Sequence, residues 1–198
     1  MRIGGYEKTS LVDFPGRVAA VVFTQGCNFR CPWCHNRQLV EPRAFGPPIP
    51  VDDIFRHLGG RVGKLSGVVV TGGEPTLQPN LESFLARLCA LGFATKLDTN
   101  GSNPAVVQKL LDRALIDFVA VDLKAPWSRY REACGVRVDT RAVQETIQLL
   151  RAQRIPHHLR TTDWAEFAPG EREEIEAIAG GSTLVWQTFR AVHLQTCG

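Results

Sequence analysis

Residues 18–36 read VAAVVFTQGCNFRCPWCHN, an apolar run followed by a cysteine-rich loop with the spacing C-x3-C-x2-C. The apolar run, Val18 to Phe23, is typical of a strand that is covered on both faces. A loop leaving the end of such a strand can wrap a small site, so the thiols of Cys27, Cys31 and Cys34 can converge on one metal centre. Thiolate sulfur is a preferred ligand of iron–sulfur clusters. In a [4Fe-4S] cluster, three cysteine ligands would leave one iron open to a small molecule.

The same loop permits three other interpretations. Cys31 and Cys34 alone form a C-P-W-C dithiol of the glutaredoxin type, whose reactivity depends on a lowered thiol pKa. Residues 31–35 also fit C-x-x-C-H, the attachment pattern of c-type haem. The three cysteines together with His35 could make a closed Cys3His zinc site. The loop by itself leaves these alternatives open.

Composition narrows the class of protein. The 198 residues predict a single domain, 1–198, with 44% hydrophobic and 22% charged residues, ordinary values for a globular chain. A net charge of +3 gives no argument for nucleic acid as a partner. No apolar stretch reaches the length of a membrane span and no signal peptide is evident, so we expect a cytoplasmic protein without a membrane partner. A reducing compartment argues against a framework of disulfides among the six cysteines, and it weakens the haem interpretation.

Apolar runs and helical patterns alternate along the rest of the chain. Helices are predicted to begin near residues 52, 80, 104, 139 and 171, whereas the residues before Arg17 show only a turn signal at Pro15-Gly16. Such alternation implies parallel strands joined by right-handed crossovers. We therefore predict an α/β fold, a partial (βα)6 TIM-like barrel. Its strands are expected at 18–23, 68–71, 93–97, 118–123, 157–161 and 184–189.

Polar clusters follow several of these strands. They are Gly72-Gly73-Glu74-Pro75, Asp98-Thr99-Asn100-Gly101, and Asp122 with Lys124. Ligands bind at the carboxyl edge of parallel sheets, so we expect the clusters to face one another. Each also has a purely structural interpretation, as a turn, a backbone cap or a local ion pair. In the functional interpretation the glycines permit close approach of a ligand, Glu74 binds an ammonium group, and Asp122 and Lys124 offer partners for a zwitterion.

A few residues outside these clusters are assigned structural roles or none. Cys89 is expected to be a buried thiol on a helix, and Cys134 and Cys197 are isolated in the sequence. Trp127 and Trp164 are expected to serve packing.

The order of these motifs resembles the radical S-adenosylmethionine (SAM) superfamily. Within it the chain is similar to the activating enzymes of glycyl radical enzymes. More narrowly it resembles the anaerobic ribonucleoside-triphosphate reductase activating proteins. The narrower resemblance rests on KTSLVDFPG at 8–16, FTQGCNFRC at 23–31 and CHN at 34–36.

The resemblance implies two cofactors, a [4Fe-4S] cluster on Cys27, Cys31 and Cys34, and SAM chelated to the remaining iron. Trp33 would then lie near the adenine, and the stretch Gly72 to Pro75 would bind the SAM amino group. The methionine and ribose side would be lined by further residues, with a monovalent cation near the two aspartates and Arg160 near the nucleoside. These further residues are Asp98, Thr99, Asp122 and Lys124.

The resemblance also implies a reaction and its partners. A flavodoxin or ferredoxin would reduce the cluster, SAM would be cleaved to a 5′-deoxyadenosyl radical, and that radical would take a hydrogen atom from a glycine of a partner enzyme. The chain departs from the family pattern at residues 163–170, and it ends soon after Phe189, which we expect to leave a lateral gap suited to a macromolecular substrate. The alternatives are a small-molecule enzyme resembling the 7-carboxy-7-deazaguanine synthases and a non-enzymatic zinc or dithiol protein.

Overall fold

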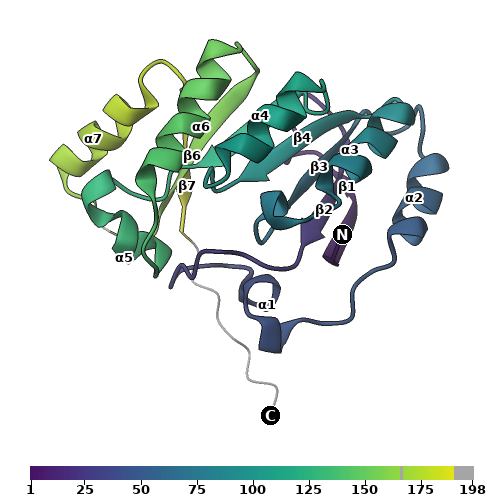
Figure 1. Cartoon of the computed structure of the whole chain (residues 1–198), viewed down its shortest axis with the longest axis horizontal. Helices are drawn as coiled ribbons and strands as arrows, with labels where there is room; N and C mark the ends of the chain where they lie inside the picture. The colour runs from purple at the N-terminus through teal and green to yellow at the C-terminus, as the bar shows by residue number, and fades with distance from the viewer. Residues whose placement is uncertain (166, 190–198) are drawn as a thin grey trace.

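The strands of the single sheet lie in the order in which they occur in the chain (Figure 1). The computed structural model describes residues 1–165 and 167–189, so that Cys197 lies outside the described part. All neighbouring strands pair in parallel except the first two, which are antiparallel. The α/β fold with an open, barrel-like parallel sheet is therefore confirmed. The strands are β1 Ile3–Ser10, β2 Ala19–Thr24, β3 Gly67–Gly72, β4 Ala94–Thr99, β5 Phe118–Asp122, β6 His157–Asp163 and β7 Thr183–Thr188.

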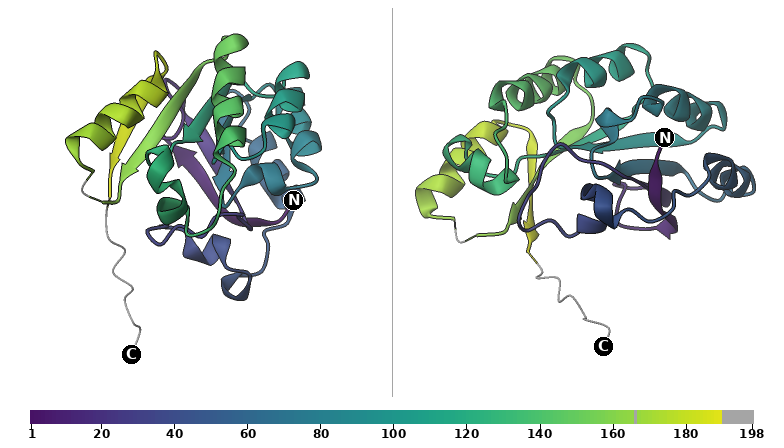
Figure 2. Two further views of the ribbon diagram at one scale, coloured as in Figure 1. Left: turned by 60° about the vertical axis from the view of Figure 1, so that its left-hand side comes forward. Right: turned by 60° about the horizontal axis from the view of Figure 1, so that its bottom comes forward.

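Most of the helices that join the parallel strands cover the outer face of the curved sheet, whereas the short helix over residues 37–40 lies apart from them (Figures 1 and 2). Their starts agree with the sequence signals, since proline occupies a first-turn position at Pro104 and Pro169, and the Asp139 side chain accepts the amide hydrogen of Arg141. The helices are α1 Arg37–Val40, α2 Val51–Gly59, α3 Leu81–Ala90, α4 Pro104–Asp112, α5 Tyr130–Cys134, α6 Thr140–Ala152 and α7 Pro169–Ala179. No helix among the described residues has the length and apolar character needed to cross a membrane.

The first strand, β1, is absent from the sequence-based prediction. Its sequence IGGYEKTS has no alternation of apolar and polar residues, and within it only Ile3 and Ser10 are buried. It is a strand because it pairs with the free edge of β2, where Tyr6 lies opposite Val22. The two short helices α1 and α5 also lack a sequence signal, because they are too brief to show a helical period.

Apolar side chains fill both faces of the sheet, but in different ways. The larger cluster lies between the sheet and the helices. On the other face, Phe14 from the β1–β2 connection packs against Ala19, Val21 and Val69. Its ring also contacts Phe118, at the beginning of β5. Phe14 therefore closes the concave side near the amino ends of the strands, which leaves the carboxyl ends available for a site.

Candidate functional site

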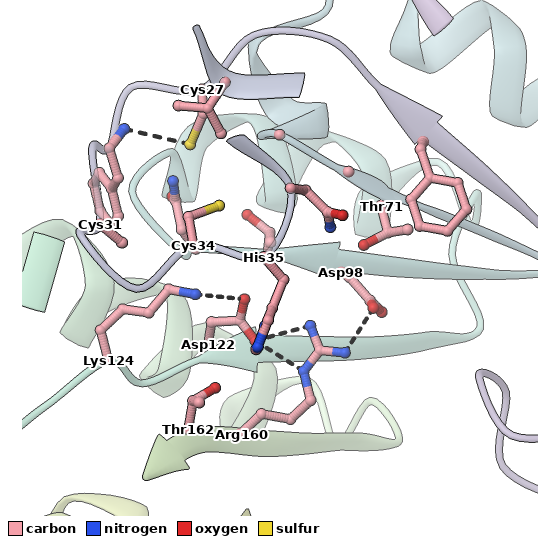
Figure 3. Close-up of a pocket in the computed structure, with 18 of the residues that line it drawn as sticks. Cys27, Cys31, Cys34, His35, Thr71, Asp98, Asp122, Lys124, Arg160 and Thr162 are labelled. Carbon is pink, nitrogen blue, oxygen red and sulfur yellow. Dashed lines mark hydrogen bonds and ion pairs between the residues drawn. The ribbon is translucent and has the colours of Figure 1, made fainter. Parts of the chain in front are cut away.

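A cavity of about 230 Å³ lies at the carboxyl ends of the parallel strands (Figure 3). It brings together most of the predicted site residues, which come from the cysteine loop and from the ends of β3, β4, β5 and β6. These residues are Cys27, Cys31, Trp33, Cys34, Gly72, Gly73, Asp98, Thr99, Asp122, Lys124 and Arg160. Glu74 and Pro75 are predicted site residues that do not line the cavity.

The cysteine loop crosses the strand ends and is held by backbone hydrogen bonds. The Gly26 amide donates to the Leu39 carbonyl over 2.7 Å, and the Phe29 amide donates to Cys27 Sγ over 3.3 Å. All three cysteines are partly buried and none is in a disulfide. Burial raises the pKa of Cys27 to about 11, whereas a hydrogen bond from Cys134 lowers the pKa of Cys31 to about 7. The thiols of Cys27 and Cys31 therefore differ in their surroundings, although they lie on the same loop.

The donor set fits an iron–sulfur cluster better than a single ion. The described residues contain no group of three cysteine, histidine or carboxylate side chains that converges closely enough to hold one metal ion. A [4Fe-4S] cluster makes a different demand, because each of its cysteine ligands binds a different iron and the sulfurs need not meet at one point. Three thiols of one loop along one wall of a cavity satisfy that demand.

The two glycines after β3 permit close contact between backbones. Gly72 has φ +113°, and a Cβ atom there would lie 2.3 Å from the Thr24 amide nitrogen. A Cβ atom on Gly73 would lie 2.1 Å from the Gly26 carbonyl oxygen. The amides of Gly73 and Glu74 donate to Thr24 and Gly26 in this contact. The glycine pair therefore fixes the start of the cysteine loop in addition to lining the cavity.

We expect Gly73→Ala to destabilise the fold by about 1–3 kcal/mol, because the added methyl group would overlap a backbone oxygen that cannot rotate away. Chemical denaturation would measure the change. Gly59→Ala is the matched control, since nothing lies within 4 Å of a Cβ atom at Gly59, the last residue of α2. Equal unfolding free energies for both variants would contradict this account of the contact.

The side chain of Glu74 is held by hydrogen bonds inside the protein. Its carboxylate is fully buried and accepts hydrogen bonds from the Thr76 amide and hydroxyl, the Thr99 hydroxyl and, over 2.7 Å, the Asn100 amide. Burial raises the pKa of this carboxyl group, while these donors lower it. Both carboxylate oxygens of Glu74 accept hydrogen bonds and the side chain has no surface in the cavity, so its predicted contact with an ammonium group stays a prediction. Glu74 ties the end of β4 to the turn after β3.

Five charged side chains alternate in sign across β4, β5 and β6. Lys96 Nζ contacts Asp98 Oδ1 at 2.6 Å. Figure 3 shows the other contacts, in which Arg160 donates to both Asp98 and Asp122 at 2.8 Å and Lys124 Nζ contacts Asp122 Oδ2 at 2.8 Å. Burial alone would raise the pKa of Asp122, but the charges of Arg160 and Lys124 outweigh it and hold that pKa well below the usual range. The three cations and two anions leave one unbalanced positive charge beside the cavity.

The guanidinium of Arg160 bridges Asp98 and Asp122, the two aspartates near which the resemblance implies a monovalent cation. Lys96 is only 2% exposed and was not predicted. Its spacing of two residues from Asp98 on one strand repeats that of Asp122 and Lys124, which is the signal that could have identified it.

Aromatic side chains form the remaining wall. The ring of Trp33 stacks on that of Trp164 with centroids 6.0 Å apart and an interplanar angle of 3°. Trp33 Nε1 donates to the Ala133 carbonyl, and Trp164 Nε1 donates to the Lys124 carbonyl. Trp164 thus packs as expected, but it packs against a cavity residue. It lies in the stretch 163–170 that departs from the family pattern.

Sequence reasoning missed several residues that line the cavity. Asp13 is the most informative of them, because it lies in the stretch 8–16 and accepts a hydrogen bond from the Ser10 hydroxyl. The stretch 8–16 therefore contributes Phe14, which closes the concave side of the sheet, and the carboxylate of Asp13, which lines the cavity. The other missed lining residues include Asn36, Thr71, Thr162 and Gln187, and His35, considered in the sequence only as part of a zinc or haem site, also lines the cavity.

Comparison with known proteins agrees with this geometry. The family model described as "Radical SAM superfamily" matches residues 21–178. The "Putative glycyl-radical enzyme activating enzyme MJ1227" of Methanocaldococcus jannaschii is 34% identical over 184 residues, which cover 89% of this chain and 73% of that protein. The pyruvate formate-lyase 1-activating enzyme of Escherichia coli (strain K12) is 35% identical over 133 residues, covering 62% of this chain and 52% of that enzyme.

Two further matches define how far the similarity extends. The 7-carboxy-7-deazaguanine synthase of Neisseria meningitidis serogroup B is 36% identical over 120 residues, covering 60% of this chain and 50% of that enzyme. The solved structure of native anSMEcpe with bound AdoMet has a TM-score of 0.64 at 17% identity, covering 84% of this chain and 50% of the other, and it shows a shared fold. The matched part of this chain thus spans about half the length of several of these relatives.

Proposed function

This chain belongs to the radical SAM superfamily, whose enzymes use a [4Fe-4S] cluster and SAM, and from that premise we propose that it generates a glycyl radical on a partner enzyme. The observation that carries the proposal is the cavity itself. One of its walls holds three thiols of a single loop, and the other holds Asp98, Asp122, Lys124 and Arg160.

When bound, the cluster would supply one electron that breaks a C–S bond of SAM, yielding methionine and a 5′-deoxyadenosyl radical. The residues of the chain hold the reactants. Lys124 and the unbalanced positive charge of the buried network suit the carboxylate of SAM, while the backbone of Gly72 and Gly73 allows its amino acid part to approach closely. The ring of Trp33 offers a flat surface for the adenine. The stacked tryptophans also exclude water from this side of the cavity.

The partner is proposed as a glycyl radical enzyme, and more narrowly as an anaerobic ribonucleotide reductase. The stretch 8–16 supports the narrower proposal, because the residues that carry that resemblance reach the site through Asp13 and shape the concave face through Phe14. A flavodoxin or ferredoxin is proposed as the electron donor, since the reaction consumes a single electron.

The second candidate function is a reaction on a small molecule, like that of the deazaguanine synthases, and the similarity to the Neisseria enzyme favours it.

An anaerobic assay tests the reaction and then the partner. The chain is reconstituted with iron and sulfide, reduced with dithionite in the presence of SAM, and assayed for 5′-deoxyadenosine and methionine by chromatography. We expect both products. A glycyl radical enzyme is then added, and electron paramagnetic resonance is used to detect the glycyl radical, with a variant of the partner lacking the glycine as the control. Product formation without a glycyl radical on any partner of this class would contradict the activase proposal and favour the small-molecule alternative.

A further inference from the structure

Trp164 joins two cavity residues that come from different parts of the chain. Its ring stacks on that of Trp33, from the cysteine loop, with centroids 6.0 Å apart and an interplanar angle of 3°. Its Nε1 donates to the carbonyl oxygen of Lys124, which follows β5, over 2.9 Å. Trp164 itself follows β6 and does not line the cavity. Any effect of Trp164 on a ligand in the cavity must therefore pass through Trp33 and Lys124.

Several contacts together fix the plane of the Trp33 ring. Its Nε1 donates to the Ala133 carbonyl over 3.0 Å, and Lys124 Nζ lies 5.1 Å from the ring centroid. The stack with Trp164 covers part of one face of the ring. A side chain on a loop can rotate about its χ angles, and each contact removes some of that freedom. The ring of Trp33 is therefore oriented in the cavity wall before any ligand arrives.

Trp164 is in turn held by neighbouring side chains. The ring of Phe167 meets it edge-on, with centroids 5.7 Å apart and an interplanar angle of 88°, and Arg129 Cζ lies 5.2 Å from its centroid. Arg129 makes ion pairs with Glu132 at 2.9 Å and with Glu171 at 3.2 Å. Edge-to-face and cation–π contacts favour one orientation of the ring. Trp164 is thus a fixed support for the side chain that stacks on it.

We propose that Trp164 is a positioning residue for SAM, which acts by holding the ring of Trp33 and the turn at Lys124 in the orientation that the ligand meets. The proposal rests on the function proposed above, in which Trp33 faces the adenine and Lys124 suits the carboxylate of SAM. Groups that are already ordered bind a ligand more tightly, because less side-chain freedom is lost on binding. Trp164 lies in the stretch 163–170 that departs from the family pattern, so the resemblance assigns it no role.

A double-mutant cycle tests whether Trp164 acts through Trp33. Trp164→Leu removes the stacked ring, Trp33→Leu removes the ring on which it acts, and a third variant carries both changes. The dissociation constant of SAM is measured by equilibrium dialysis on reconstituted chains of known iron content. We expect Trp164→Leu to weaken SAM binding about two- to tenfold, the range for one aromatic pair. In the Trp33→Leu background the same substitution should weaken it less. Equal losses in both backgrounds would overturn the proposal.

Two further variants separate positioning from a general loss of structure. Trp164→Phe keeps an aromatic ring and should restore most of the SAM affinity. Trp127→Leu is the matched control, because Trp127 is also partly buried against the core, packs on the ring of Tyr130 and does not line the cavity. A loss of SAM affinity in Trp127→Leu as large as that in Trp164→Leu would overturn the specific role of Trp164.

Near-ultraviolet circular dichroism of the cluster-free chain measures the stack without any reaction, since it reports the fixed packing of aromatic rings. We expect Trp33→Phe and Trp164→Phe each to abolish the same band, and Trp127→Phe to leave it unchanged. If Trp164→Leu loads no iron, this spectrum decides the case. A shared band supports the proposal, and a spectrum in which the two substitutions have unrelated effects overturns it.

The outcomes also distinguish this proposal from the function on which it rests. A folded and iron-loaded Trp164→Leu variant with unchanged affinity for SAM would overturn the role of Trp164 and leave the radical SAM reaction intact. A reconstituted wild-type chain that binds no SAM would overturn the proposed function, and this proposal with it.

Discussion

Replacement of Cys34 by alanine is expected to abolish cluster assembly and to lower the formation of 5′-deoxyadenosine by at least about 100-fold. The estimate is a lower bound, because loss of even an outer-shell partner of a metal ligand costs about 10–100-fold. Cys34 lies on the cavity wall beside Cys27 and Cys31, and the loop carries no further cysteine that could replace it. The measurements are iron content after reconstitution and chromatography of the reaction products.

Cys89→Ala is the control for this prediction. Cys89 also carries a free thiol, but its sulfur lies 4.0 Å from the Leu115 carbonyl oxygen on the outer side of the sheet and not in the cavity. It should therefore retain both iron and activity. A Cys34→Ala variant with full iron content and undiminished SAM cleavage would contradict the ligand assignment. Stoichiometric zinc in the wild-type chain, with no assembly of iron and sulfide, would favour the zinc interpretation instead.

Arg160→Met is expected to destabilise the folded state by about 3–5 kcal/mol. Each aspartate would keep one lysine partner, Asp98 with Lys96 and Asp122 with Lys124, but would lose the charge-assisted hydrogen bond from Arg160, and such bonds contribute about 1.5–3 kcal/mol each. Arg160 is the cation shared by Asp98 and Asp122, and the side chains of Arg160 and Asp98 are only 17% and 7% exposed. Methionine keeps much of the apolar part of the arginine side chain, so the substitution tests the loss of the guanidinium group and not the loss of packing. Denaturant unfolding of the cluster-free chain would measure it.

Arg56→Met is the matched control, because the Arg56–Asp53 pair has a similar distance of 2.6 Å but side chains that are 75% and 52% exposed. Exposed pairs contribute about 0–1 kcal/mol, so we expect little change in that variant. Similar losses for Arg160→Met and Arg56→Met would contradict the view that the hydrogen bonds from Arg160 to Asp98 and Asp122 stabilise the fold.

Most of the fold could be predicted because its elements carry local signals. Val18 to Phe23 and Val68 to Val70 are continuous apolar runs, and β2 and β3 formed there. The buried residues of α3, which are Leu81, Phe84, Leu85 and Leu88, follow the helical period. β1 shows the limit of this approach, because two glycines and a polar half give it no pattern. Its strand conformation comes from its pairing with β2. The period of apolar residues within one segment cannot predict such a contact between two segments.

The sequence by itself determined which chemistry the site can perform. The cysteine spacing, the polar residues at strand ends and the order of the motifs are local properties, and parallel strands bring their carboxyl ends to one edge. Only the tertiary structure decided how those groups are used. It buried Glu74 among backbone amide and hydroxyl donors and placed Arg160 between two aspartates. The physical reason is that burial and the sign of the neighbouring charge, which are set by residues distant in the chain, decide whether a polar side chain faces a ligand or stabilises the protein.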